Sequence, residues 1–197
     1  MCAACAAYRL PWSSAGPYID GMNNSPIMED ALGQFRAYKT MAEKAMAQVS
    51  DDEYFEQIDA ESNSIALIVK HLAGNLHSRW MDFLTSDGEK PDRDRDGEFV
   101  TEAADTRGSL EARWQEAWSV TLAALGNLSD RDLPREVQIR GEPHTVLKAV
   151  NRNLTHLAYH VGQITFLAKH LAGQRWQTLS LPRNKGRVST GRTTRPH

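Results

Sequence analysis

The chain has few cysteines and no long apolar run. Its 197 residues include two cysteines, Cys2 and Cys5, so a disulfide framework is excluded and a reducing cytoplasm is the expected location. No run of about 18 apolar residues occurs, so we expect no membrane-spanning helix. The first residues also lack a charged stretch followed by an apolar one, and we therefore expect no secretory signal.

The two cysteines form a Cys-x-x-Cys pair, a spacing that metal sites and redox centres use. Neither a helical nor a strand period surrounds the pair. We therefore interpret the thiols as incidental parts of an untethered leader.

An excess of charge of one sign is also missing. The 23 Lys and Arg residues are balanced by 25 Asp and Glu residues, which gives a net charge of −2. No face gathers basic residues, so we expect neither a nucleic-acid partner nor a membrane partner. The length fits one domain with a sizeable core.

Hydrophobic periodicity divides the chain into one domain and two tails. Residues 1–24 have no period, so we expect a disordered leader in which Met22 is an alternative start. Residues 25–180 carry the periodic segments. Residues 181–197 are polar and mildly basic, and we expect them to form a flexible tail.

Four segments repeat apolar residues at helical spacing. The pattern predicts helices over about residues 25–49, 63–85, 109–126 and 145–172. Residues 137–139 are compatible with one short strand. Four amphipathic helices with almost no strand predict an all-α fold, namely a four-helix bundle.

The connection between the second and third helices is unusually long. Within residues 87–107, acidic and basic side chains alternate from Asp92 to Asp96, and there is no apolar period. A connection of this length is uncommon in a compact domain and is often functional. Two interpretations of this connection remain, a lid and a solvated loop, and the alternating charge favours the solvated loop.

Two histidines, His156 and His160, lie four residues apart within the last helix. This spacing places both imidazoles on one helical face, where they can hold one divalent cation. His71, beside the apolar stripe of the second helix, is a candidate third ligand. Spacing alone leaves exposed or hydrogen-bonded histidines as the more common alternative. The remaining histidines are weaker candidates: His77, His144, His170 and His197.

Five stretches of the chain are distinctive when taken together: NSIALIVKHLAGN (63–75), SRWMDFLTSDGEK (78–90), IRGEPH (139–144), LTHLAYHVGQI (154–164) and WQTLSLP (176–182). Together they resemble the DinB superfamily of metal-binding four-helix bundles, in particular a subgroup known only as a domain of unknown function. The resemblance spans roughly residues 28 to 187.

The resemblance implies a metal site and a topology. In DinB-like proteins one histidine of helix two and two of helix four coordinate a divalent metal, which implies these roles for His71, His156 and His160. The fold implied is up-down-down-up, with a long crossover between helices two and three. Helices two and four are then antiparallel, so four residues are expected to line the site and bind a substrate: Asn75, Arg79 and Asn153 at one mouth, and Gln163 on the other side. Ordinary interhelical hydrogen bonds are the alternative for each.

Three histidines on Zn²⁺ or Ni²⁺ leave a coordination position for water or a substrate atom. Characterised DinB relatives include S-transferases and isomerases that use low-molecular-weight thiols, so the resemblance implies a metal-dependent thiol S-transferase or hydrolase acting on a small molecule. No general base is evident, and the nearest carboxylates are Glu142, better placed to complement a helix dipole, and Asp82.

A non-catalytic metal- or ligand-binding module, or a structural homodimer, is the competing interpretation. Tryptophans 80, 114 and 118 are compatible with a core or with a subunit interface.

Overall fold

The computed structural model describes residues 26–180, and these residues are mostly helical, as predicted. The expectations for residues 1–24, with Cys2, Cys5 and Met22, and for residues 181–197 lie outside the described residues. The elements are α1 (Pro26–Met46), α2 (Asp51–Phe55), α3 (Ile65–Trp80), the 3-10 helix η1 (Gly97–Phe99), α4 (Arg107–Gly126), β1 (Glu136–Ile139), β2 (Glu142–Thr145), α5 (Val146–Ala172) and the 3-10 helix η2 (Gly173–Arg175).

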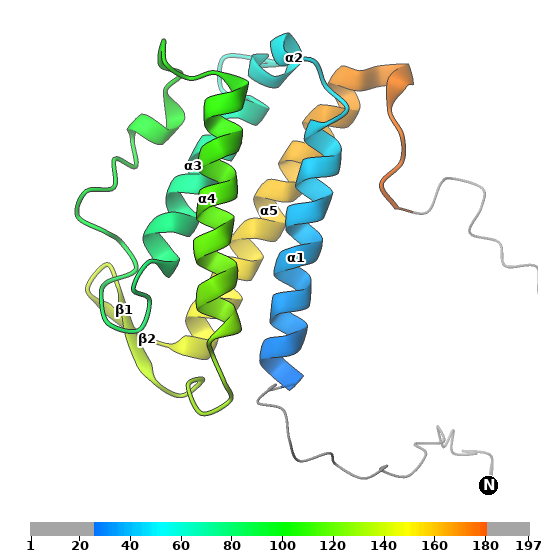
Figure 1. Ribbon diagram of the computed structural model, residues 1–197. Coiled ribbons are helices and arrows are strands. Elements are labelled where there is room, and N and C mark those ends of the chain that lie inside the picture. The colour runs from blue at the N-terminus through cyan, green and yellow to red at the C-terminus, as the bar shows by residue number, and fades with distance from the viewer. Residues whose placement is uncertain (1–25, 181–197) are drawn as a thin grey trace, which may run out of the picture.

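The four long helices lie side by side, and α1 packs mainly on α5 while α3 packs mainly on α4 (Figure 1). In this view α1 and α5 run upward, whereas α3 and α4 run downward. The connection between α3 and α4 lies along the outer side of α3. Because α3 and α5 are antiparallel neighbours, side chains near their middles can face one another.

Aromatic side chains fill the centre between the helices. Phe35 of α1 makes edge-to-face contacts with Trp80 of α3 and Trp118 of α4, at ring-centroid distances of 5.9 and 6.4 Å. Trp114 packs on Trp118, and all four side chains are at most 1% exposed. The three tryptophans are therefore core residues. The sequence alone had left a core and a subunit interface as the two interpretations.

Hydroxyl caps define the helix starts. The side chains of Ser64, Thr106 and Thr145 accept hydrogen bonds from backbone N–H groups in the first turns of α3, α4 and α5. The short helix α2 was not predicted, although Ser50 and Glu53 form a capping box at its start. Five residues are too few to show a helical period, which explains the omission.

A β-hairpin leads into α5. Strands β1 and β2 pair antiparallel, with Ile139 opposite Glu142. The two turn residues, Arg140 and Gly141, have φ values of 59° and 71°, as a type I′ turn requires. The carboxylate of Asp87 accepts hydrogen bonds from both of their backbone N–H groups, at 2.8 and 2.7 Å. The long connection is thereby attached to the hairpin.

The expectation of a solvated connection is wrong for three of its charged side chains. Those of Arg93, Glu98 and Asp105 are 4%, 7% and 1% exposed. Asp105 pairs with the buried Lys70 of α3, with an N–O distance of 2.8 Å. In this connection the alternating charges therefore include side chains that form ion pairs inside the protein as well as side chains exposed to solvent.

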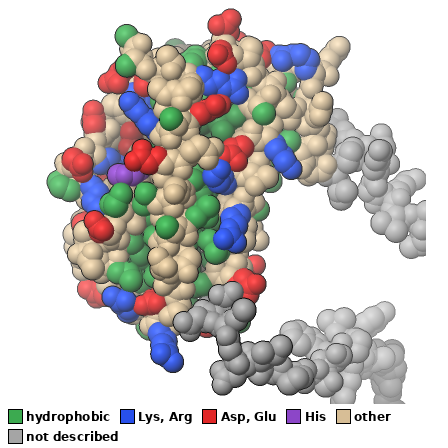
Figure 2. Space-filling model, viewed as in Figure 1, with side chains coloured by type: hydrophobic (Ala, Val, Ile, Leu, Met, Phe, Trp, Pro, Cys, Tyr) green, Lys and Arg blue, Asp and Glu red, His purple; other side chains and the backbone are tan. Residues whose placement is uncertain are grey.

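No helix among the described residues is long and apolar enough to cross a membrane. On the face seen in Figure 2, acidic and basic side chains are interspersed, with hydrophobic side chains between them.

Candidate metal centre

Two helices bring the predicted histidines together. His71 lies on α3, and His156 and His160 lie one turn apart on α5. The Nε2 atom of His156 is 3.2 Å from Nε2 of His71 and 3.1 Å from Nε2 of His160. One ring nitrogen from each residue lies within 4.8 Å of the other two. The three side chains could therefore hold a metal ion.

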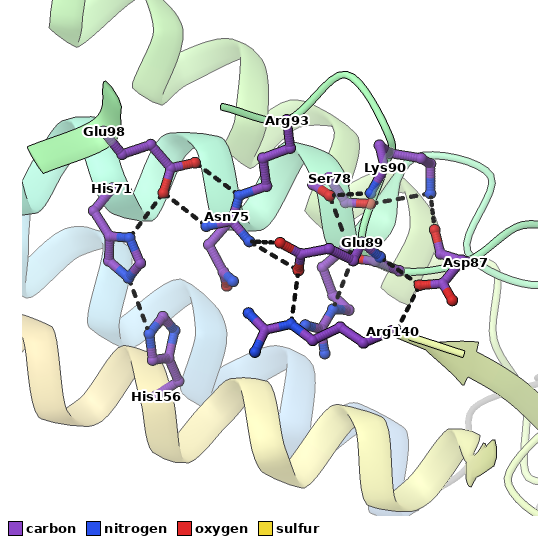
Figure 3. A network of polar contacts seen from close by, with 12 residues as sticks. His71, Asn75, Ser78, Asp87, Glu89, Lys90, Arg93, Glu98, Arg140 and His156 are labelled. Atoms are coloured by element: carbon purple, nitrogen blue, oxygen red, sulfur yellow. Dashed lines mark hydrogen bonds and ion pairs between the residues drawn. The ribbon is translucent and has the colours of Figure 1, made fainter. Parts of the chain in front are cut away.

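A carboxylate fixes the orientation of His71. Nδ1 of His71 lies 2.9 Å from Oε2 of Glu98, which comes from η1 in the connection (Figure 3). Because an ionised carboxylate only accepts hydrogen bonds, Nδ1 carries the proton and Nε2 presents a lone pair. Arg93 donates to both oxygens of Glu98, each at 2.7 Å. Burial raises the pKa of Glu98, but the hydrogen bonds from His71 and Arg93 outweigh it and lower that pKa below its usual value.

Neighbouring side chains also hold the His160 ring and one face of the His71 ring. Nδ1 of His160 lies 2.7 Å from Oε1 of Gln163, one turn further along α5. As the amide oxygen accepts, Nε2 of His160 again presents a lone pair. On the other side, Phe99 stacks on the His71 ring, with ring centroids 4.7 Å apart. Both rings are thus held in place by contacts outside the cluster.

The histidines of α5 are neutral at physiological pH. Burial, the neighbouring His160 and His71, and more distant arginines lower the pKa of His156 to about 3. Burial and the neighbouring His71 lower the pKa of His160 to about 4, against the opposing effect of its hydrogen bond to Gln163. Neutral imidazole is the form that binds metals.

Two of the three separations between these nitrogens match those of a bound divalent metal. In a tetrahedral zinc site, Zn–N distances of about 2.0–2.1 Å separate two ligand nitrogens by about 3.3 Å. The observed separations of 3.1 and 3.2 Å are close to this value. The unprotonated Nε2 atoms of His71 and His160 both lie next to Nε2 of His156. A cation at the centre would satisfy all three, and such a site has the carboxylate–histidine support that is usual around metals.

A cavity of about 430 Å³ lies in front of the cluster, and all four residues expected to bind a substrate line it together with the three histidines. Two of the four are engaged in the core. The amide of Asn153 accepts from Nε1 of Trp80 at 2.8 Å and donates to Oδ1 of Asn75 at 3.0 Å. Gln163 contacts His160, which leaves Arg79 as the member with the greatest free hydrogen-bonding capacity.

Neither carboxylate considered as a general base lines this cavity. Glu142 is exposed in β2, and Asp82 is exposed beyond the end of α3, with φ of 49°. The structure therefore places neither carboxylate beside the histidines, because sequence proximity to a helix end does not bring a side chain to the middle of the helix. Glu98 is the acid that contacts the cluster, and it lies behind His71 rather than in the cavity. Sequence reasoning missed it, since the connection that carries Glu98 has no apolar period to show which of its side chains turn inward.

The model of a family described as "Protein of unknown function (DUF1572)" matches residues 23–185. The chain belongs to this family. No curated protein and no solved structure matches the chain. All three histidines, Glu98 and the arginines around the cavity lie in the part that matches the DUF1572 model.

Proposed function

We propose that this DUF1572 protein is a DinB-like metalloprotein, in which α1, α3, α4 and α5 form the bundle and His71, His156 and His160 hold Zn²⁺ or Ni²⁺. The observation that supports this most directly is the meeting of three imidazole Nε2 atoms beside a cavity. The antiparallel course of α3 and α5 supports the topology that the DinB resemblance implies.

A metal-dependent enzyme acting on a small molecule, of the thiol S-transferase or hydrolase type, is the activity we propose. When bound, a divalent metal would supply a Lewis acid that holds a thiol as thiolate or lowers the pKa of a water molecule. In an S-transfer the thiol sulfur bonds to an electrophilic carbon, the leaving group departs with its electron pair, and the thiol proton goes to solvent. Glu98 and Gln163 would orient the rings, and Phe99 would shield His71 from water.

The composition of the cavity wall favours thiol chemistry over hydrolysis. It equally suits a non-catalytic binding module. Among the described residues that line the cavity, none is acidic. Hydrolysis generally uses a general base within hydrogen-bond reach of the attacking water. A thiol that loses its proton on binding to a metal needs no such base.

Metal content tests the site. Untagged protein should contain about one equivalent of Zn²⁺ or Ni²⁺ after loading and desalting, and His156→Ala should lose it. His170→Ala is the matched control, because His170 is exposed near the end of the same helix. His156 is only partly buried, so the variant should fold, and circular dichroism checks this. Equal metal content in His156→Ala and the wild type would refute the site.

Turnover separates the enzyme from the binding module. Metal-loaded protein is incubated with low-molecular-weight thiols and an electrophilic substrate, and product formation is compared with that of free metal and of His156→Ala. Rates no higher than free metal, in protein that retains its metal, would favour the binding module.

A further inference from the structure

The wall of the cavity is rich in arginine. Its guanidinium groups come from α3, the long connection, the hairpin turn and α5: Arg79, Arg93, Arg95, Arg140 and Arg152. Four separate segments of the chain therefore contribute positive charge to one small compartment. Asparagine, glutamine, histidine and aromatic side chains complete the lining.

Two carboxylates neutralise part of this charge from behind. Glu98 pairs with Arg93, and Glu89 lies 3.1 Å from Nη1 of Arg93 and 3.4 Å from Nε of Arg140 (Figure 3). Neither acid lines the cavity. Their ion pairs anchor Arg93 and Arg140, whereas the other arginines of the cavity have no carboxylate partner among residues 26–180.

Among the arginines of the cavity wall, Arg79 gives the strongest indication of an anion site. It is only 4% exposed, and its Nε donates a hydrogen bond to the carbonyl oxygen of Gly88, at 3.2 Å. No carboxylate of the described residues lies within ion-pair distance of it. Burial and the neighbouring guanidinium of Arg152 lower the pKa of Arg79 to about 10. A buried cation without a carboxylate partner is costly, and an anion entering the cavity would offset this cost.

Arg152 stands on the histidine side of the cavity. It precedes His156 by four residues, so the two side chains share one face of α5. Its Nη1 donates to Nε2 of His144 at 3.1 Å, and Nδ1 of His144 in turn donates to the carbonyl oxygen of Glu142 at 3.0 Å. Arg152 is thus held by a neutral neighbour and has no carboxylate partner within the described part of the chain.

We propose that the cavity binds a small molecule through an oxyanion group, a carboxylate or a phosphate, which Arg79 and Arg152 receive next to the histidine cluster. A guanidinium group matches the two oxygens of either anion with parallel hydrogen bonds. The volume of about 430 Å³ is that of a small-molecule site. The placement of the ligand's reactive part beside a metal rests on the proposed function, whereas the binding of the anion by the arginines does not.

Calorimetric titration with inorganic phosphate and with succinate tests this inference. Each probe is added to metal-loaded and to chelator-treated protein, in low-chloride buffer. We expect saturable binding of at least one probe to both forms. Arg152→Gln and Arg79→Lys should weaken binding about ten- to a hundredfold, as the loss of charge-assisted hydrogen bonds does. Arg36→Gln is the matched control, because Arg36 is exposed on α1 and does not line the cavity.

The outcomes separate this inference from the proposed function. Binding that depends on the arginines and persists in metal-free His156→Ala would support the anion site even if the metal site failed. Binding that disappears with the metal but is unchanged in both arginine variants would overturn the anion site and leave the metal site intact. Absence of binding for both probes to both protein forms would also overturn it. Arg152 is exposed, so its variant tests the site without endangering the fold.

Discussion

Glu98 and His71 are joined by a buried hydrogen bond of 2.9 Å across 27 residues of sequence. Glu98 belongs to a connection that lies outside the four long helices, whereas His71 lies in the middle of α3. The connection therefore contributes to the geometry of the candidate metal centre without providing a ligand. A carboxylate behind a histidine fixes its tautomer and raises its basicity, and loss of such a partner typically weakens metal affinity.

Glu98→Gln should weaken zinc affinity about ten- to a hundredfold while the three histidines remain in place. The amide retains an acceptor for His71 but loses the negative charge that supports it. Competition with a chromophoric chelator measures the affinity. Glu102→Gln removes an acid that is 57% exposed in the same connection and should leave the affinity unchanged. If both variants bind zinc as the wild type does, Glu98 serves only to neutralise Arg93.

Gly74 leaves the space that Glu98 occupies. A Cβ atom at position 74 would lie 2.0 Å from Oε1 of Glu98, so Gly74→Ala must displace the carboxylate from His71. We expect zinc affinity to fall about ten- to a hundredfold, by the same loss of support.

Gly162→Ala is the matched control for this substitution. Gly162 also lies within a helix, but a Cβ atom there meets nothing within 4 Å. Alanine should stabilise α5 by about 0.5–1 kcal/mol, since glycine is a poor helix former, and zinc affinity should not change. A Gly74→Ala variant with wild-type affinity would show that Glu98 is dispensable.

The histidine cluster illustrates what the sequence can predict. A spacing of four residues places His156 and His160 on one face by helix geometry alone, and the structure has them there. The position of His71 beside the apolar stripe of its helix made it a candidate, but only the resemblance implied that it meets the other two, because periodicity does not say which helices are neighbours. Glu98 had no signal of either kind. Its role depends on how an aperiodic connection folds back over α3, which is set by tertiary contacts such as the pair of Lys70 with Asp105.

Asn153 shows a further limit of sequence reasoning. It was expected to bind a substrate, and it does line the cavity, but both groups of its amide are engaged with other side chains. A polar residue on the inner face of a helix can face a ligand or a buried donor, and the sequence does not distinguish these. Here the buried indole of Trp80 takes the amide oxygen.

Asn153→Ala should therefore lower the free energy of unfolding by about 1–3 kcal/mol, because it leaves the indole N–H of Trp80 and the amide of Asn75 without partners. Chemical denaturation followed by tryptophan fluorescence measures this. Asn151→Ala, at an exposed position on the same helix, is the control and should change stability little. Equal stability of the two variants would mean that Asn153 serves the ligand rather than the core.

The metal-free protein should lose stability as the pH falls below about 6.5. In the unfolded chain, His156 and His160 take up protons near their ordinary pKa of about 6.5. In the folded protein burial lowers the pKa of His156 to about 3 and that of His160 to about 4. The unfolded state therefore binds more protons between these limits, and the free energy of unfolding decreases with falling pH.

Urea unfolding of chelator-treated protein at pH 7.5 and 5.5 tests this dependence, in a range where carboxylates contribute little. His156→Gln removes one of the two groups, so its stability should fall less over this range than that of the wild type. His170→Gln, at an exposed position of the same helix, should retain the wild-type decrease. If His156→Gln loses as much stability as His170→Gln, then His156 is not held neutral by burial, and its imidazole would not be ready to bind a cation at mildly acidic pH.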